Sequence, residues 1–362
     1  MAYTTIDDPS AYFKVKAYAG DGNDGNAITF DDTDTNMQPD MVWLKGRTFS
    51  DNHTLYDQAR GTNKYLHPDT TSIQYTNSSP NFGVKSFDSD GFTLGAWSAL
   101  NRSSEDHIAW CWKANGSGSA NSDGNTTTTT TSANTTSGLS IITYEGDGAA
   151  ATLGHGLGAV PHFIIQKNID DSENWQVYHH KNTSAPETDY LTLNTTNATG
   201  DQSSRWNDTA PTSTLITIGS DSSVSQSGES MVMYAWSEKQ GYSKFGSYTG
   251  NGADDDGPFI YLGFRPSFVL IKRSSATESW VIWDTTRNTY NPMIKSLVAD
   301  STNAEDTTGS SGYLYLDALS NGFKITSTSA GNGSNASGST YIYAAFAEAP
   351  FVNSNGVPCN AR

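Results

Sequence analysis

Cysteine is nearly absent from this chain, since only Cys111 and Cys359 occur among 362 residues. Two distant thiols exclude a disulfide framework and a zinc site built from several thiolates. No apolar run reaches the roughly 18 residues that a membrane-spanning helix needs, and residues 1–10 lack the basic and apolar parts of a secretory leader. We therefore expect a soluble protein, made in the cytoplasm without a signal peptide, that does not insert into membranes.

Basic residues are also scarce. Lys and Arg total 21 against 38 Asp and Glu, which gives a formal net charge of −17. Binding to phosphate backbones requires clustered cations that release counterions. The charge balance therefore predicts that nucleic acid is not a partner.

Catalytic signatures are missing as well. The sequence has no Gly-x-Ser-x-Gly motif, and its seven histidines are dispersed without zinc-ligand spacing. A glycosidase needs only two carboxylates that folding brings together, so spacing alone does not exclude one. We predict a protein that is not an enzyme and that uses no cofactor.

Small polar residues and glycine account for much of the remaining composition. Charged residues make up 16% of the chain, hydrophobic residues 35%, and there are 33 glycines. Ser, Thr, Asn and Gly favour strands and turns over helices.

One unit occurs three times along the sequence. Each copy contains a proline-led apolar run in which a lysine lies six residues after the proline, at Pro39–Lys45, Pro161–Lys167 and Pro266–Lys272. A short run follows in each copy, and it ends twelve residues after that lysine: His53–Asp57, Trp175–His179 and Trp280–Asp284. A third run closes each copy: His107–Lys113, Met231–Ser237 and Tyr341–Ala347.

The closing runs alternate large apolar and small residues. Trp110, Tyr234 and Ala344 occupy the same position in the three copies. A period of two is typical of a strand with one buried face, and the small residues between suit a face that another sheet approaches closely. With no helical periodicity of ten residues or more, the sequence predicts an all-β fold of three tandem antiparallel β-sandwich domains, jelly-roll-like in type.

The domain boundaries follow from the copies. We predict a first sandwich at 1–114, a second at 139–241 and a third at 242–362. Residues 115–138 are rich in Thr, Asn, Gly and Ser and hold nothing that could nucleate a core. They are predicted to form a flexible linker, with the first domain on a tether and the other two packed as a rigid pair.

Two kinds of charged position are candidate sites. Asp57 with Arg60, and Asp284 with Arg287, recur at the ends of the short runs, but His179 and Asn182 replace them in the middle copy. We interpret them as structural ion pairs at exposed strand ends, worth roughly 0–1 kcal/mol each. The acidic turn Asp254, Asp255 and Asp256 offers oxygen ligands for a structural calcium ion, although Asp is also an ordinary turn residue.

Aromatic residues in polar surroundings are the candidate contacts for a receptor or glycan. Trp97, Trp206 and Tyr290 lie among Ser, Asn and Asp, outside the repeated runs. Such rings stack on sugar faces while amides and carboxylates bond to the hydroxyls. The alternative is that they close the ends of a sandwich.

The repeated runs resemble a module of structural proteins of tailed bacteriophages, especially marine and cyanophage-like ones. The similarity rests on the stretches 241–252, 263–273, 321–325 and 339–348, and in the first copy on 38–45 and 109–113. The similarity covers nearly the whole chain and implies that the protein comes from a tailed bacteriophage, but it assigns no catalytic or binding residue.

This resemblance implies a virion structural protein, with a tail fibre or spike subunit on the particle surface that contacts host surface glycans as the leading hypothesis. The alternatives are a capsid decoration or head-fibre protein and, less favoured, a surface-glycan depolymerase. The implied partners are other virion proteins of the tail or capsid, a host receptor, and two further copies of the chain in a homotrimer.

Overall fold

The computed structural model describes residues 4–30, 35–77, 79–308, 315–326 and 333–360. Within them strands dominate, and the helices are single short turns: η1 (Pro9–Ala11), α1 (Ser98–Asn101), α2 (Ser203–Trp206) and α3 (Ser222–Ser225). None of the helices in these ranges is long and apolar enough to cross a bilayer. The prediction of an all-β fold is confirmed.

Each copy contains a main antiparallel sheet with the same strand order. In the first copy the order is β1 (Phe13–Ala19), β9 (Asp106–Trp112), β3 (Met41–Gly46) and β4 (Thr54–Asp57). The matching strands of the second copy are β11 (Leu139–Glu145), β18 (Ser230–Trp236), β13 (Phe163–Asn168) and β14 (Gln176–His179). Those of the third are β19 (Ser243–Thr249), β26 (Thr340–Pro350), β21 (Phe264–Arg273) and β22 (Trp280–Asp284). The closing strand is therefore central in every sheet, next to the proline-led strand.

Smaller sheets cover the outer faces of the main sheets. They consist of β2 (Asn26–Thr29), β8 (Gly91–Leu94) and β7 (Val84–Asp88); of β12 (Ala151–Gly154) and β17 (Leu215–Ile218); and of β20 (Phe259–Tyr261), β25 (Gly322–Thr326) and β24 (Tyr315–Leu319). The remaining strands are short or lie at sheet edges: β5 (Lys64–Tyr65), β6 (Tyr75–Thr76), β10 (Thr130–Asn134), β15 (Asp189–Thr192), β16 (Gly200–Asp201) and β23 (Leu297–Val298).

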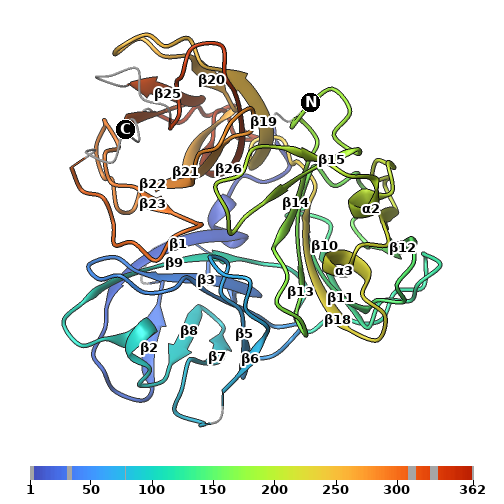
Figure 1. Ribbon diagram of the computed structural model, residues 1–362. Coiled ribbons are helices and arrows are strands. Elements are labelled where there is room, and N and C mark those ends of the chain that lie inside the picture. Colours follow the sequence, from blue (N-terminus) through green and yellow to red (C-terminus); the bar gives the residue numbers. More distant parts are fainter. Residues whose placement is uncertain (1–3, 31–34, 78, 309–314, 327–332, 361–362) are drawn as a thin grey trace.

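The three main sheets face one another around a common centre, so each copy forms one of three lobes (Figure 1). Their inner faces build a single apolar cluster with residues from all copies, among them Trp112, Trp236 and Phe346. A separate cluster fills the space between the main and the smaller sheet of each copy. The closing strands are consequently buried on both faces, rather than on one as the alternation predicted.

The small residues of the closing strands face the outer clusters. Ala109 and Cys111 pack in the first copy, Ala235 in the second and Ala345 in the third. Small side chains let the smaller sheet approach closely, as predicted.

The prediction of a flexible linker is wrong. Residues 130–134 form β10, which pairs with β11 along its full length and extends the main sheet of the second copy. Thr126 also forms a bridge to Leu153 in β12. Thr has a high strand propensity, so Thr130 and Thr131, beside an open sheet edge, begin a strand although the segment cannot nucleate a core.

The picture of a tethered first domain beside a rigid pair is wrong for a related reason. Trp43, Trp110 and Trp112 of the first copy lie in the same cluster as the side chains of the other two copies. Because each main sheet needs its inner face covered, the three copies complete one another and share one core.

Candidate functional site

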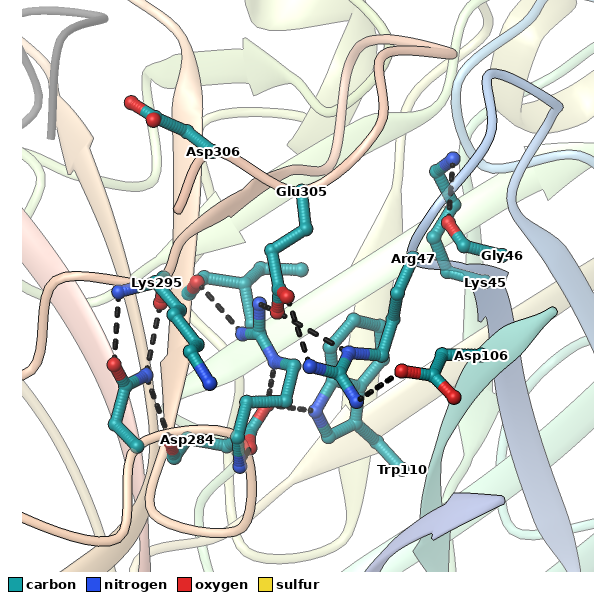
Figure 2. Close-up of polar contacts among 12 residues, drawn as sticks. Lys45, Gly46, Arg47, Asp106, Trp110, Asp284, Lys295, Glu305 and Asp306 are labelled. Atoms are coloured by element: carbon teal, nitrogen blue, oxygen red, sulfur yellow. Dashed lines mark hydrogen bonds and ion pairs between the residues drawn. The ribbon is translucent and has the colours of Figure 1, made fainter. Parts of the chain in front are cut away.

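A buried charged network joins the first and third copies (Figure 2). Arg287 donates from Nε to Asp284 Oδ2 at 2.5 Å and from Nη1 to Glu305 Oε1 at 3.0 Å. Glu305 Oε2 also accepts from Arg47 Nη2 at 2.9 Å, and Asp284 Oδ2 accepts from the indole Nε1 of Trp110 at 3.1 Å. Arg47 and Trp110 belong to the first copy, so this network holds two lobes together.

The junction of the first and second copies repeats the arrangement. Arg60 donates from Nε to Asp57 Oδ2 at 2.6 Å, and the hydroxyl of Tyr234 donates to the same oxygen at 2.6 Å. Tyr234 occupies the closing-strand position of Trp110, and Gln74 Oε1 accepts from Arg60 in the role that Glu305 has for Arg287. At both of these junctions the aromatic donor therefore comes from the neighbouring copy.

The junction of the second and third copies lacks both the Asp–Arg pair and the aromatic donor. His179 replaces the aspartate, and the closing strand carries Ala344 where the others carry Trp110 or Tyr234. His179 Nε2 instead donates to the carbonyl oxygen of Tyr343 at 3.1 Å, and its Nδ1 accepts from the amide of Lys181 at 3.1 Å. The charged pair and its aromatic partner are thus absent together.

Stability should depend on the protonation of His179. Burial, with further lowering by His180 and His162, brings the pKa of His179 to about 3, against 6.5 in the unfolded chain. The unfolded state therefore binds the proton first, and this histidine removes stability as pH falls from about 6.5 towards 3. A second proton would also break the bond that Nδ1 accepts from Lys181.

We expect the variant His179→Gln to lose less free energy of unfolding between pH 7 and pH 4 than the unmodified protein, by on the order of 3 kcal/mol. Urea unfolding at both pH values measures the difference. Parallel pH dependences of the two proteins would contradict the expectation.

The lysines of the proline-led strands are buried at the ends of their sheets. Burial lowers the pKa of Lys45, Lys167 and Lys272 to about 8 in each case. Backbone carbonyls bind the ammonium groups: Lys45 donates to Thr302 O at 3.2 Å and Lys272 to Thr196 O at 3.0 Å, both in a neighbouring copy. Lys45 and Lys272 therefore connect neighbouring lobes, whereas Lys167 donates to the carbonyl oxygens of Asn168 and Asp171 in its own copy.

The interpretation of Asp57–Arg60 and Asp284–Arg287 as structural pairs agrees with this geometry, but their predicted exposure is wrong. The two aspartate side chains are fully buried, and the arginine side chains are 2% and 0% exposed. The strand ends point into the junctions between lobes rather than into solvent. Removing one partner of such a pair costs far more than at a surface.

The acidic turn does not assemble a calcium site. Asp254, Asp255 and Asp256 are exposed, and Asp256 Oδ1 pairs with Lys324 Nζ at 3.0 Å. Within the described ranges, no group of three or more His, Cys, Asp or Glu side chains is placed to hold a metal ion. The turn therefore lacks the convergent oxygens that calcium requires.

The three aromatic candidates differ in how far they are exposed to solvent. Trp206 is buried in the outer cluster of the second copy, 1% exposed and edge-on to Tyr178, so its assignment as a surface contact is wrong. Tyr290 is 81% exposed, between β22 and β23 of the third copy. Trp97 is half-buried and stacks on Phe82, with ring centroids 4.4 Å apart.

Trp97 belongs to an aromatic ladder that sequence reasoning missed, formed by Tyr75, Tyr65, Trp97 and Phe82. Tyr65 lies between Tyr75 at 5.1 Å and Trp97 at 4.9 Å, and Tyr75 is 40% exposed. These residues come from β5, β6 and the loops beside α1 and β7, so only folding brings them together. The one signal in the sequence was the density of aromatic residues between 65 and 97.

Phe82, at the end of the aromatic ladder, lines an open hollow of about 430 Å³ on the first lobe. The other lining residues come from two segments of the first copy: Thr62, Asn63, Asn77, Ser79, Pro80, Val84 and Lys85. The centre of the molecule has no comparable space, because the cavity among the inner aromatic residues measures about 10 Å³ and is apolar. The hollow is therefore a better candidate for ligand binding than the centre of the molecule.

Comparison with known proteins identifies one family. A family model described as a domain of unknown function, DUF7483, matches residues 8–350. No curated protein and no solved structure matches the chain. The matched range includes the main sheets of all three lobes and nearly all of their shared centre, and the chain belongs to the DUF7483 family.

Proposed function

We propose that this protein is a structural component of a bacteriophage particle, a tail fibre or spike subunit displayed on the virion surface that contacts glycans of the host envelope. The observation that carries the proposal is the construction of the lobes. Their inner faces share one aromatic core and are joined by buried polar contacts, while the smaller outer sheet has three strands in the first and third lobes and two in the second. A shared, well-packed centre that holds three outer sheets suits a protein that presents contacts rather than one that moves.

Composition and the repeated sequence runs support the same role. A net charge of −17 favours solubility at high local concentration, and because both cysteines are free, the fold does not depend on a disulfide. The runs that resemble tailed-phage modules form the core strands β3, β9, β21 and β26.

The test is the copy number of the protein in purified virions, measured by quantitative mass spectrometry against the major capsid protein. A tail fibre or spike subunit is expected at a few dozen copies or fewer. Hundreds of copies would favour a capsid decoration or head-fibre protein, and absence from the particle would overturn the proposal.

The oligomeric state is the second part of the proposal, with a homotrimer as the expected assembly. Sedimentation of the purified chain tests it. Three lobes already surround one centre in a single chain. A monomer at micromolar concentration would therefore mean that one chain supplies the threefold arrangement alone, and would remove the homotrimer from the proposal.

A further inference from the structure

We infer that the hollow on the first lobe binds a neutral saccharide, with Phe82 as the stacking surface. The inference rests on the proposed function in one respect, because it names the site through which that function would contact a glycan. The site itself is argued from the chemistry of its wall.

The wall offers uncharged hydrogen-bonding groups. Thr62, Asn63 and Ser79 contribute hydroxyl and amide groups, and Asn63 is exposed. The one cationic side chain of the lining, Lys85, has its Nζ 2.5 Å from Asp24 Oδ1 and is neutralised there. With a net charge of −17 on the chain, this wall favours a neutral ligand over an anionic one.

The aromatic ladder supplies the stacking surface. Phe82 lines the hollow, and Trp97 is stacked on it at an interplanar angle of 20°. Tyr65 continues the ladder to the exposed ring of Tyr75. Because Trp97 packs against the Phe82 ring, Phe82 offers its remaining surface to a sugar at little entropic cost.

Backbone hydrogen bonds and a tight glycine turn hold the loop that forms one wall of the hollow. Asn77 Nδ2 donates to Phe82 O at 3.0 Å, and the amide of Gly95 donates to Gly83 O at 2.8 Å. Gly83 has φ +66°, and a Cβ there would lie 1.9 Å from the hydroxyl of Tyr56. Only glycine lets this loop close over Tyr56, so the wall is preorganised.

Size and lining indicate binding rather than catalysis. A volume of about 430 Å³ lies within the range of small-molecule sites and accommodates one or two pyranose rings. The described lining side chains include no carboxylate and no imidazole, the groups that hydrolysis of a glycosidic bond uses.

The experiment titrates the full chain with neutral tri- and tetrasaccharides of glucose, galactose, mannose and N-acetylglucosamine, and with matched uronic and sialic acid oligosaccharides. Calorimetry and saturation-transfer NMR are the readouts. We expect at least one neutral probe to bind with a dissociation constant near or below about 1 mM, and the acidic probes to bind more weakly.

Three variants locate the site. Phe82→Ala should weaken binding by about fivefold or more, and Asn63→Ala, which alters only an exposed side chain, by about threefold. Phe259→Ala removes an exposed ring on the third lobe, away from the hollow, and should leave saccharide binding unchanged. Thermal midpoints show whether Phe82→Ala is still folded, and if it is not, Asn63→Ala decides.

The inference is overturned if no neutral probe binds at about 10 mM, if only acidic probes bind, or if Phe259→Ala abolishes binding while Asn63→Ala does not. Failure of the proposed function looks different. The chain would then bind the saccharide but be absent from virions.

Discussion

Replacing Asp284 with alanine is expected to lower the free energy of unfolding by about 3–5 kcal/mol. The carboxylate is fully buried and accepts hydrogen bonds from Arg287 and from the indole of Trp110. Its loss leaves a buried guanidinium with Glu305 as its remaining carboxylate, and a buried indole N–H without an acceptor. Because the network joins two lobes, we expect the lobes to separate more easily.

Urea unfolding measures the effect, and Asp256→Ala is the matched control. Asp256 also pairs with a lysine, but its side chain is 84% exposed, so its loss should cost about 1 kcal/mol or less. Equal losses in the free energy of unfolding for the two variants would contradict the interpretation that Asp284 stabilises a buried junction between lobes.

The junction of the second and third copies suggests a compensated variant. That junction has neither the Asp–Arg pair nor its aromatic donor, yet it packs in the same fold. A triple variant, Asp284→Asn with Arg287→Met and Trp110→Phe, removes the charges together and keeps most of the volume. We expect it to lose less stability than Asp284→Ala alone, because coupled residues are not additive.

The strands could be predicted from the sequence because their signals are local. The proline-led run Pro266–Lys272 lies within β21, and the alternation of the closing run Tyr341–Ala347 lies within β26. A period of two and the turn residues between runs depend only on neighbouring positions. Fold class therefore followed from the sequence directly.

The arrangement of the copies could not be predicted in the same way. Trp112 and Trp236 are buried in either model, whether each copy closes on itself or all three share a centre. Their ring centroids lie 6.3 Å apart, a contact between copies that no local pattern encodes. The edge strand β10 escaped prediction for the same reason, since its stability comes from β11 rather than from its own side chains.

The candidate site was predicted in part. Trp97 and Trp206 have similar surroundings in the sequence, since each lies among small polar residues. In the structure, however, Trp206 is buried in the outer cluster of the second copy. The charged pairs appeared dispensable because the middle copy lacks them. The joint change to His179 and Ala344 was visible in the sequence, and only the contact between Asp284 and Trp110 shows why the two positions change together.

Replacing Phe346 with alanine is expected to cost about 3–5 kcal/mol and to lower the midpoint of one cooperative thermal transition by roughly 4–7 °C. Phe346 contacts aromatic rings of all three copies, with centroid distances of 5.6 Å to Trp112, 6.5 Å to Trp236 and 6.0 Å to Phe268. A cavity there removes contacts from every lobe at once, so no lobe can unfold while the others keep their covered faces.

Calorimetry separates this architecture from independent domains. We expect one transition, with equal calorimetric and van't Hoff enthalpies, in both the unmodified protein and Phe346→Ala. Tyr290→Ala, at an exposed ring, should leave the midpoint in place. Two resolved transitions, of which Phe346→Ala moves only one, would contradict a shared core. A single transition that shifts as a whole would mean that the triplet is the smallest unit that folds, because each sheet obtains its second covered face from the other two copies.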